Sequence, residues 1–254
     1  MAGMDLSVLI ALGLLGFIGG VGITTVGPGG VLPTIALFTL TDLTPAQVAG
    51  TAIVTHVATG VLGTAAYTRS GQLREPGTRR TALILSATAL FGTPLGVVIN
   101  TSVSKQAFGL VLAVFVAGVA ALVWYRDRHE QAATMTQPPT GLVAVLGLAV
   151  AVAAGIVGIG GPMLTVPLLV ALGLPVLESV ASAQVQSIVI AAVGTVGYLG
   201  QGAIDWPLAA LVGIPELAGV LLGWKIAHAL PTRTLKRVLI VTLFALAPYL
   251  ALHS

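Results

Sequence analysis

Two short glycine-rich stretches interrupt apolar runs that would otherwise continue as helices. Val26–Gly30 reads VGPGG, and Val157–Gly161 reads VGIGG. Glycine lets a ligand approach the backbone closely, and glycine and proline together break a helix. A helix that restarts after such a break presents unpaired N–H groups and partial positive charge, which favour a small anion. The predicted substrate site therefore includes Gly27, Pro28, Gly29, Gly30, Gly158, Gly160, Gly161 and Pro162.

Polar side chains follow both stretches inside later apolar runs. Thr51 and Thr55 are four residues apart and share one helical face. Ser182, Gln184, Gln186 and Ser187 lie at the equivalent depth of the second half. We predict that Thr51, Thr55, Ser182, Gln184 and Gln186 complete the hydrogen-bond shell of the anion. The alternative is that these groups bond between helices or to their own helix carbonyls.

Two ionisable residues, His56 and Glu216, lie near the middle of apolar runs. A charged carboxylate at the bilayer centre costs at least about 2.5 kcal/mol, so ionisable groups there usually serve a function or share a proton. Histidine is the side-chain type that changes charge near neutral pH. We predict proton coupling through one or both residues, and a substrate contact for His56. The alternative is a neutral pairing across a helix interface.

The composition is that of a polytopic helical membrane protein. Of the 254 residues 56% are hydrophobic and 7% are charged, whereas a soluble domain has about 25% charged residues. Apolar runs of membrane-spanning length recur along the chain, and their continuity excludes a β-barrel. The net charge of +3 comes from basic residues in loops, which argues against nucleic-acid binding. No P-loop, metal-ligand cluster or catalytic triad is visible, so no cofactor, metal or catalytic residue is predicted.

The two halves of the chain are similar to each other. A shift of 131 positions carries VGPGGVLPTIAL from Val26 onto VGIGGPMLTVPL from Val157, and GTAAYTRSG from Gly63 onto GTVGYLGQG from Gly194. Each half contains five apolar segments, of which the second is too short to span a membrane. The segments are 5–26, 31–41, 45–68, 80–101 and 105–125, then 140–158, 162–173, 176–199, 206–228 and 234–251. This divides the chain into a first repeat (1–126), a linker (127–139) and a second repeat (140–254).

Loop charges predict that the repeats are inverted. The loop after the third segment carries Arg69, Arg74, Arg79 and Arg80, whereas its counterpart in the second half has only Asp205. Basic loops favour the cytoplasmic side, so equivalent loops lie on opposite sides of the membrane. The linker is then cytoplasmic and both termini are non-cytoplasmic. Tyr67 and Tyr198, near segment ends, are expected to anchor the membrane interface.

Together, the duplication and the placement of its motifs resemble the TauE/SafE family of sulfite and organosulfonate exporters over nearly the whole chain. In that family a small-residue stretch similar to GTS follows each glycine-rich turn, and here AGTA (Ala49–Ala52) and ASAQ (Ala181–Gln184) take its place. The resemblance implies ion-coupled transport of a small sulfur oxyanion across a bacterial-type inner membrane.

The residues alone leave other functions open. An anion-selective channel on the same scaffold is the main alternative. An intramembrane enzyme built on His56 and Glu216 is disfavoured, because no nucleophile or metal set accompanies them. The oligomeric state is not indicated by the sequence. The predicted partners are therefore a small anionic substrate and the lipid bilayer.

Overall fold

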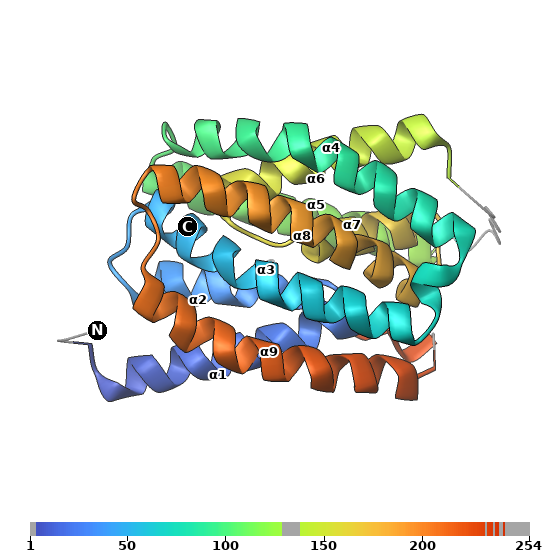
Figure 1. Ribbon diagram of the computed structural model, residues 1–254, viewed down its shortest axis with the longest axis horizontal. Coiled ribbons are helices and arrows are strands. Elements are labelled where there is room, and N and C mark those ends of the chain that lie inside the picture. Colours follow the sequence, from blue (N-terminus) through green and yellow to red (C-terminus); the bar gives the residue numbers. More distant parts are fainter. Residues whose placement is uncertain (1–3, 129–137, 232, 236, 239–240, 242–254) are drawn as a thin grey trace.

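The computed structural model describes residues 4–128, 138–231, 233–235, 237–238 and 241, and all regular secondary structure in these ranges is helical. The long helices run side by side along one direction (Figure 1). In chain order the elements are α1 (Leu6–Thr25), η1 (Pro28–Val31), α2 (Leu32–Leu40), α3 (Pro45–Arg69), η2 (Gln72–Arg74), α4 (Pro76–Asn100), α5 (Lys105–Arg128), α6 (Thr140–Val157), α7 (Pro162–Ala171), α8 (Val176–Gly200) and α9 (Trp206–Ala229).

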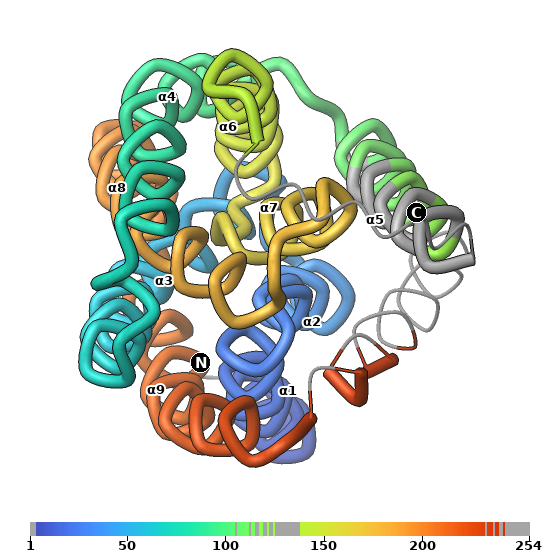
Figure 2. The backbone as a smooth tube through the Cα atoms, turned by 90° about the vertical axis from the view of Figure 1, so that its right-hand side faces the viewer, coloured from blue at the N-terminus to red at the C-terminus, as the bar shows by residue number. Residues whose placement is uncertain are grey.

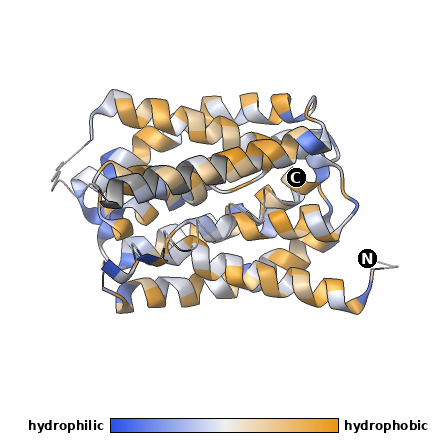
Figure 3. Cartoon of the chain, turned by 180° about the vertical axis from the view of Figure 1, so that it is seen from behind, coloured by the Kyte–Doolittle hydropathy of each residue, from blue (hydrophilic) through white to orange (hydrophobic). Residues whose placement is uncertain are grey.

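The prediction of an all-helical multi-pass membrane protein is confirmed. Among the described residues, six helices are long and apolar enough to cross a membrane: α1, α3, α4, α6, α8 and α9. Hydrophobic residues cover the helices along their length, and hydrophilic residues gather mainly at the two ends of the bundle (Figure 3). The predicted short second segments are the η1–α2 unit and α7. The predicted last segment, 234–251, lies largely outside the described residues.

Local sequence explains where several helices begin. Thr44 and Gln47 form a reciprocal capping box at the start of α3, with Pro45 in the first turn. The side chain of Asp205 accepts a hydrogen bond from the Leu208 amide, at 3.0 Å, at the start of α9. Pro162 occupies the first position of α7, where its missing amide costs no helical hydrogen bond.

Glycines let two pairs of helices pack backbone against backbone. α1 lies along α9, and α4 lies along α6 (Figure 2). A β-carbon at Gly16 or Gly20 of α1 would overlap the α9 backbone, and one at Gly96 of α4 would overlap that of α6. Small residues allow this close approach. The van der Waals contacts that result hold the helices together within lipid, where the hydrophobic effect does not drive helices to associate.

Helices α3 and α8 bury the largest share of their residues among the six candidate spans. They cross each other in antiparallel directions, because Gly63 of α3 faces Gln184 of α8 while Gly194 of α8 faces Ile53 of α3. The shift of 131 positions converts one of these contacts into the other. The most buried part of the bundle is therefore built from corresponding helices of the two halves.

The prediction that Tyr67 and Tyr198 anchor the membrane interface is wrong. Both side chains are fully buried. The Tyr67 hydroxyl donates to the Thr24 carbonyl at 2.5 Å, and the Tyr198 hydroxyl donates to the Gly155 carbonyl at 2.6 Å. These carbonyls lie in the last turns of α1 and α6, where backbone acceptors lack intrahelical partners. The tyrosines satisfy acceptors that the helix breaks leave open.

Replacing either tyrosine by phenylalanine tests this role. Tyr67→Phe and Tyr198→Phe keep the ring but leave a buried carbonyl without a hydrogen-bond donor. Each should therefore lower the free energy of unfolding by about 1–2 kcal/mol. Thermal unfolding in detergent measures the effect, with Trp206→Phe at an exposed position as a control that should be silent. A large loss in one variant and none in the other would contradict the equivalence of the two contacts.

Candidate functional site

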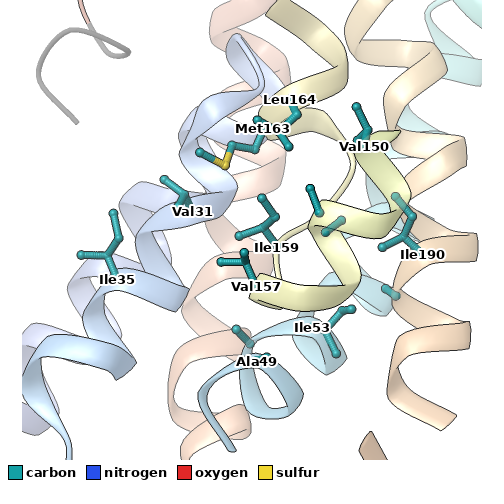
Figure 4. Close-up of a cluster of buried hydrophobic side chains, with 14 of the residues drawn as sticks. Val31, Ile35, Ala49, Ile53, Val150, Val157, Ile159, Met163, Leu164 and Ile190 are labelled. Carbon is teal, nitrogen blue, oxygen red and sulfur yellow. The ribbon is translucent and has the colours of Figure 1, made fainter. Parts of the chain in front are cut away.

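The two glycine turns end α1 and α6 at buried positions where only glycine fits. Gly27 has φ 102° and Gly158 has φ 74°, both in the left-handed region. A β-carbon at Gly27 would lie 2.6 Å from the Pro162 carbonyl oxygen, so the first turn lies against the start of α7. A β-carbon at Gly158 would overlap the backbone of Ala49 in α3. In Figure 4, Val157, Ile159 and other apolar side chains pack this second turn against Ala49 and Val31.

The His56 side chain lies close to both turns. A β-carbon at Gly30 would be 3.7 Å from His56 Cε1, and one at Gly160 would be 3.3 Å from His56 Cγ. His56 is fully buried in α3. Because Gly30 and Gly160 have no side chains, the imidazole approaches the backbone of both halves of the chain.

His56 also meets Glu216 of α9. His56 Nδ1 lies 3.2 Å from Glu216 Oε1, and both side chains are fully buried. The distance is that of an ion pair, yet none of the ring nitrogens or carboxyl oxygens makes an aligned hydrogen bond. The sequence identified these two residues separately, and the tertiary structure brings them together. A buried pair of this kind, with polar atoms left unsatisfied, carries a desolvation cost.

Ser187 of α8 completes the cluster. Its Oγ is buried without a hydrogen-bond partner and would lie 2.9 Å from a β-carbon at Gly160. Ser187 was not among the residues predicted from the sequence to bind the anion. The signal that singles it out is the shift of 131 positions, which places Ser187 at the position of His56. We call His56, Glu216, Ser187, Gly30 and Gly160 the central cluster.

The two predicted glutamines brace the helix breaks beside this cluster. Gln184 Nε2 donates to the Ile23 carbonyl at 3.1 Å, near the end of α1. Gln186 Oε1 accepts a hydrogen bond from Thr165 at 2.6 Å and would lie 3.0 Å from a β-carbon at Gly161. Gln184 Oε1 has no partner of its own. The amide groups thus hold α1 and α7 in place, and one acceptor remains free.

The three predicted hydroxyl groups each make a structural contact. Thr51 Oγ1 accepts a hydrogen bond from the Asp205 amide at 2.9 Å, and Ser182 donates to the Thr78 carbonyl at 3.1 Å. Thr55 donates to the Ala52 carbonyl of its own helix at 2.9 Å. Thr51 therefore joins the start of α9 to α3, and Ser182 joins the start of α4 to α8.

The remaining glycine-turn residues pack against the rest of the chain. In η1, Pro28 is buried, and Gly29 faces the backbone of Gly22 in α1.

Broken helices and a buried polar cluster beside the breaks, within a bundle of candidate spans, are the organisation of a membrane transporter. The chain belongs to the family described as Sulfite exporter TauE/SafE, which matches residues 12–250. This is a family of transporters and not of enzymes. The chain is also 25% identical over 241 residues to the "Probable membrane transporter protein YdhB" of Bacillus subtilis (strain 168), which covers 92% of this chain and 95% of that protein. No solved structure matches the present chain significantly.

The contact at Gly158 generates a stability prediction with a matched control. Gly158→Ala adds a methyl group that overlaps the Ala49 backbone. Gly202 also has a positive φ, 65° against 74°, but has open space around it, so Gly202→Ala is the control. We expect Gly202→Ala to cost about 1–2 kcal/mol of folding free energy, and Gly158→Ala to cost several kcal/mol more. Thermal unfolding of both variants in detergent gives the difference. Equal losses would mean that the turn is not tightly held against α3.

Proposed function

We propose that this protein is a secondary transporter of a small sulfur oxyanion, sulfite or an organosulfonate, in a bacterial-type inner membrane. The observation that carries the proposal is the position of His56, which lies close to both glycine turns and contacts Glu216, with Ser187 beside the second turn and polar atoms left unpaired. Membership of a family of exporters of small anions such as sulfite supports the substrate class.

The proposed architecture is a pair of inverted repeats, residues 1–126 and 140–254, joined by a linker at 127–139. Three observations support it: the shared shift of 131 positions, the matching Tyr67 and Tyr198 contacts, and the antiparallel crossing of α3 and α8. Inverted repeats let one packing arrangement exchange for its counterpart about a pseudo-two-fold axis in the membrane plane, which opens the site to either side of the membrane in turn. In this arrangement the linker faces the cytoplasm.

The chemistry of the central cluster suits an anion that must be released again. The Ser187 hydroxyl can donate to an oxyanion oxygen, and a protonated His56 adds a charged donor. Gly30 and Gly160 leave the backbone accessible to a small ligand. No Lys or Arg is among the buried polar residues of the described chain, so binding rests on neutral donors, helix ends and one titratable pair.

Proton coupling follows from the His56–Glu216 pair in this proposal. A proton gained by the pair raises the charge of the cluster by one unit, so anion affinity depends on its protonation. By thermodynamic linkage, the anion changes the proton affinity of the pair by the same factor. The side chains of the cluster are closed to solvent, which favours a carrier with an occluded site over a continuously open channel.

Transport in proteoliposomes tests the coupling. Sulfoacetate stays fully ionised between about pH 6 and 8, so any pH dependence of its uptake belongs to the protein. We expect a pH gradient to drive accumulation by the wild type, and Glu216→Gln to abolish accumulation while retaining exchange of internal for external substrate. Glu178→Gln, at the start of α8, is the matched control and should behave like the wild type. Unchanged gradient-driven accumulation in Glu216→Gln would remove the carboxyl group from coupling.

Thermal stabilisation tests the binding site. Purified protein is titrated with sulfite, sulfate, thiosulfate, sulfoacetate, taurine and chloride, and we expect a saturable rise in Tm with one sulfur oxyanion. Ser187→Ala removes a buried hydroxyl that has no partner, so the fold should persist while anion affinity falls about tenfold. Ser102→Ala, at an exposed position, should leave affinity unchanged. Stabilisation that is identical in both variants would place the anion elsewhere.

A further inference from the structure

A cavity at the surface, separate from the central cluster, is lined by three arginines. It has a volume of about 420 Å³ and lies between the starts of α4 and α6. These two helices lie side by side (Figure 2). Its lining residues are Arg74, Pro76, Arg79, Arg80, Leu83, Ile84 and Thr140. None of them belongs to the central cluster, so the cavity is distinct from the proposed substrate site.

The charge in this cavity is of one sign. Arg74, Arg79 and Arg80 line it, and no acidic residue does. Arg80 donates to the Thr140 hydroxyl, which joins α4 to α6 and fixes that guanidinium. Within the described chain, neither Arg74 nor Arg79 takes part in a salt bridge. The guanidinium groups of Arg74 and Arg79 are therefore available to bind an anion, beside the guanidinium group of Arg80, which the Thr140 bond holds in place.

Pro76, Leu83 and Ile84 supply the apolar part of the lining, and exposed apolar side chains continue from Leu83 along the surface of α4 and α6. Leu83 is 58% exposed, and exposed apolar side chains follow it at Leu90 and Phe91 of α4 and at Leu142 and Val145 of α6. Both helices are candidate membrane spans, and the cavity lies at their first turns. This is the level at which lipid headgroups meet the ends of a membrane-spanning bundle.

We propose that this cavity binds the phosphate group of an anionic membrane phospholipid of the phosphatidylglycerol type. The arginines hold the phosphate through forked, charge-assisted hydrogen bonds, and the acyl chains lie along α4 and α6. The N-terminal ends of both helices add positive potential at the same place. Basic pockets between membrane helices recognise lipid headgroups in this way. The inference does not depend on the proposed function, because it involves neither the central cluster nor a transported anion.

The test uses the full chain purified in detergent and titrated with three probes: dioctanoyl phosphatidylglycerol, dioctanoyl phosphatidylcholine and inorganic phosphate. We expect a saturable rise in Tm with phosphatidylglycerol alone. An equal rise with phosphatidylcholine would overturn selectivity for an anionic lipid. An equal rise with inorganic phosphate would make the cavity a site for a soluble anion and would also overturn the proposal.

Variants locate the effect. Arg74→Gln/Arg79→Gln removes two charges from the cavity and keeps the Arg80–Thr140 bond, and we expect the apparent affinity for phosphatidylglycerol to fall tenfold or more. Arg69→Gln/Arg237→Gln removes the same charge from residues outside the lining and should change affinity less than about twofold. Equal losses in the two double variants would overturn the assignment to this cavity.

A single substitution guards against a loss of folding in the double variant. Arg79→Lys keeps the charge and removes the planar fork, so it should retain the native Tm and bind phosphatidylglycerol several-fold more weakly than the wild type. Wild-type affinity in Arg79→Lys and in Arg79→Gln would show that this arginine does not hold the lipid and would overturn the proposal.

Discussion

Within a hydrocarbon environment every backbone N–H and C=O group needs a partner from the protein itself, because no water is present to supply one. The glycine turns break two helices at buried positions, and the carbonyl groups near each break must be satisfied by tertiary contacts. Tyr67 and Tyr198 supply two such contacts, to Thr24 and Gly155. Gln184 supplies another, to Ile23. Much of the polar content of the bundle is explained by this requirement.

Once these structural contacts are assigned, several buried polar atoms among the described residues still lack a partner, and three of the residues that carry them lie together. His56, Glu216 and Ser187 have no aligned hydrogen bonds, although each is fully buried. Apolar residues of similar size would avoid the desolvation cost of these groups. Under the proposed function, a bound anion or a shared proton offsets this cost.

The cluster is also asymmetric with respect to the duplication. The shift of 131 positions relates His56 to Ser187 and Glu216 to Leu85. One half of the chain therefore contributes an imidazole where the other contributes a hydroxyl, and the carboxyl group has an apolar counterpart. Under the proposed function, a single titratable pair serves one binding site, although the scaffold that holds it occurs twice.

The sequence by itself determined the helical membrane class, the two helix breaks and the short helices after them. These features are local, because apolar runs of membrane-spanning length and the glycine and proline of the turns set them directly. Sequence position gives the depth of a residue along a helix but not the direction in which its side chain points. For that reason Tyr67 and Tyr198 were wrongly expected at the membrane interface.

Only the tertiary structure decided which polar residues meet. His56 and Glu216 are 160 positions apart in the chain, and their 3.2 Å contact depends on how α3 and α9 pack. Ser182 and Ser187 share α8, yet one bonds to the start of α4 and the other reaches Gly160. Five positions separate them, which is a rotation of about 500°, so the two side chains lie on different faces of the helix. The packing of α8 against its neighbours then decides which serine faces the site.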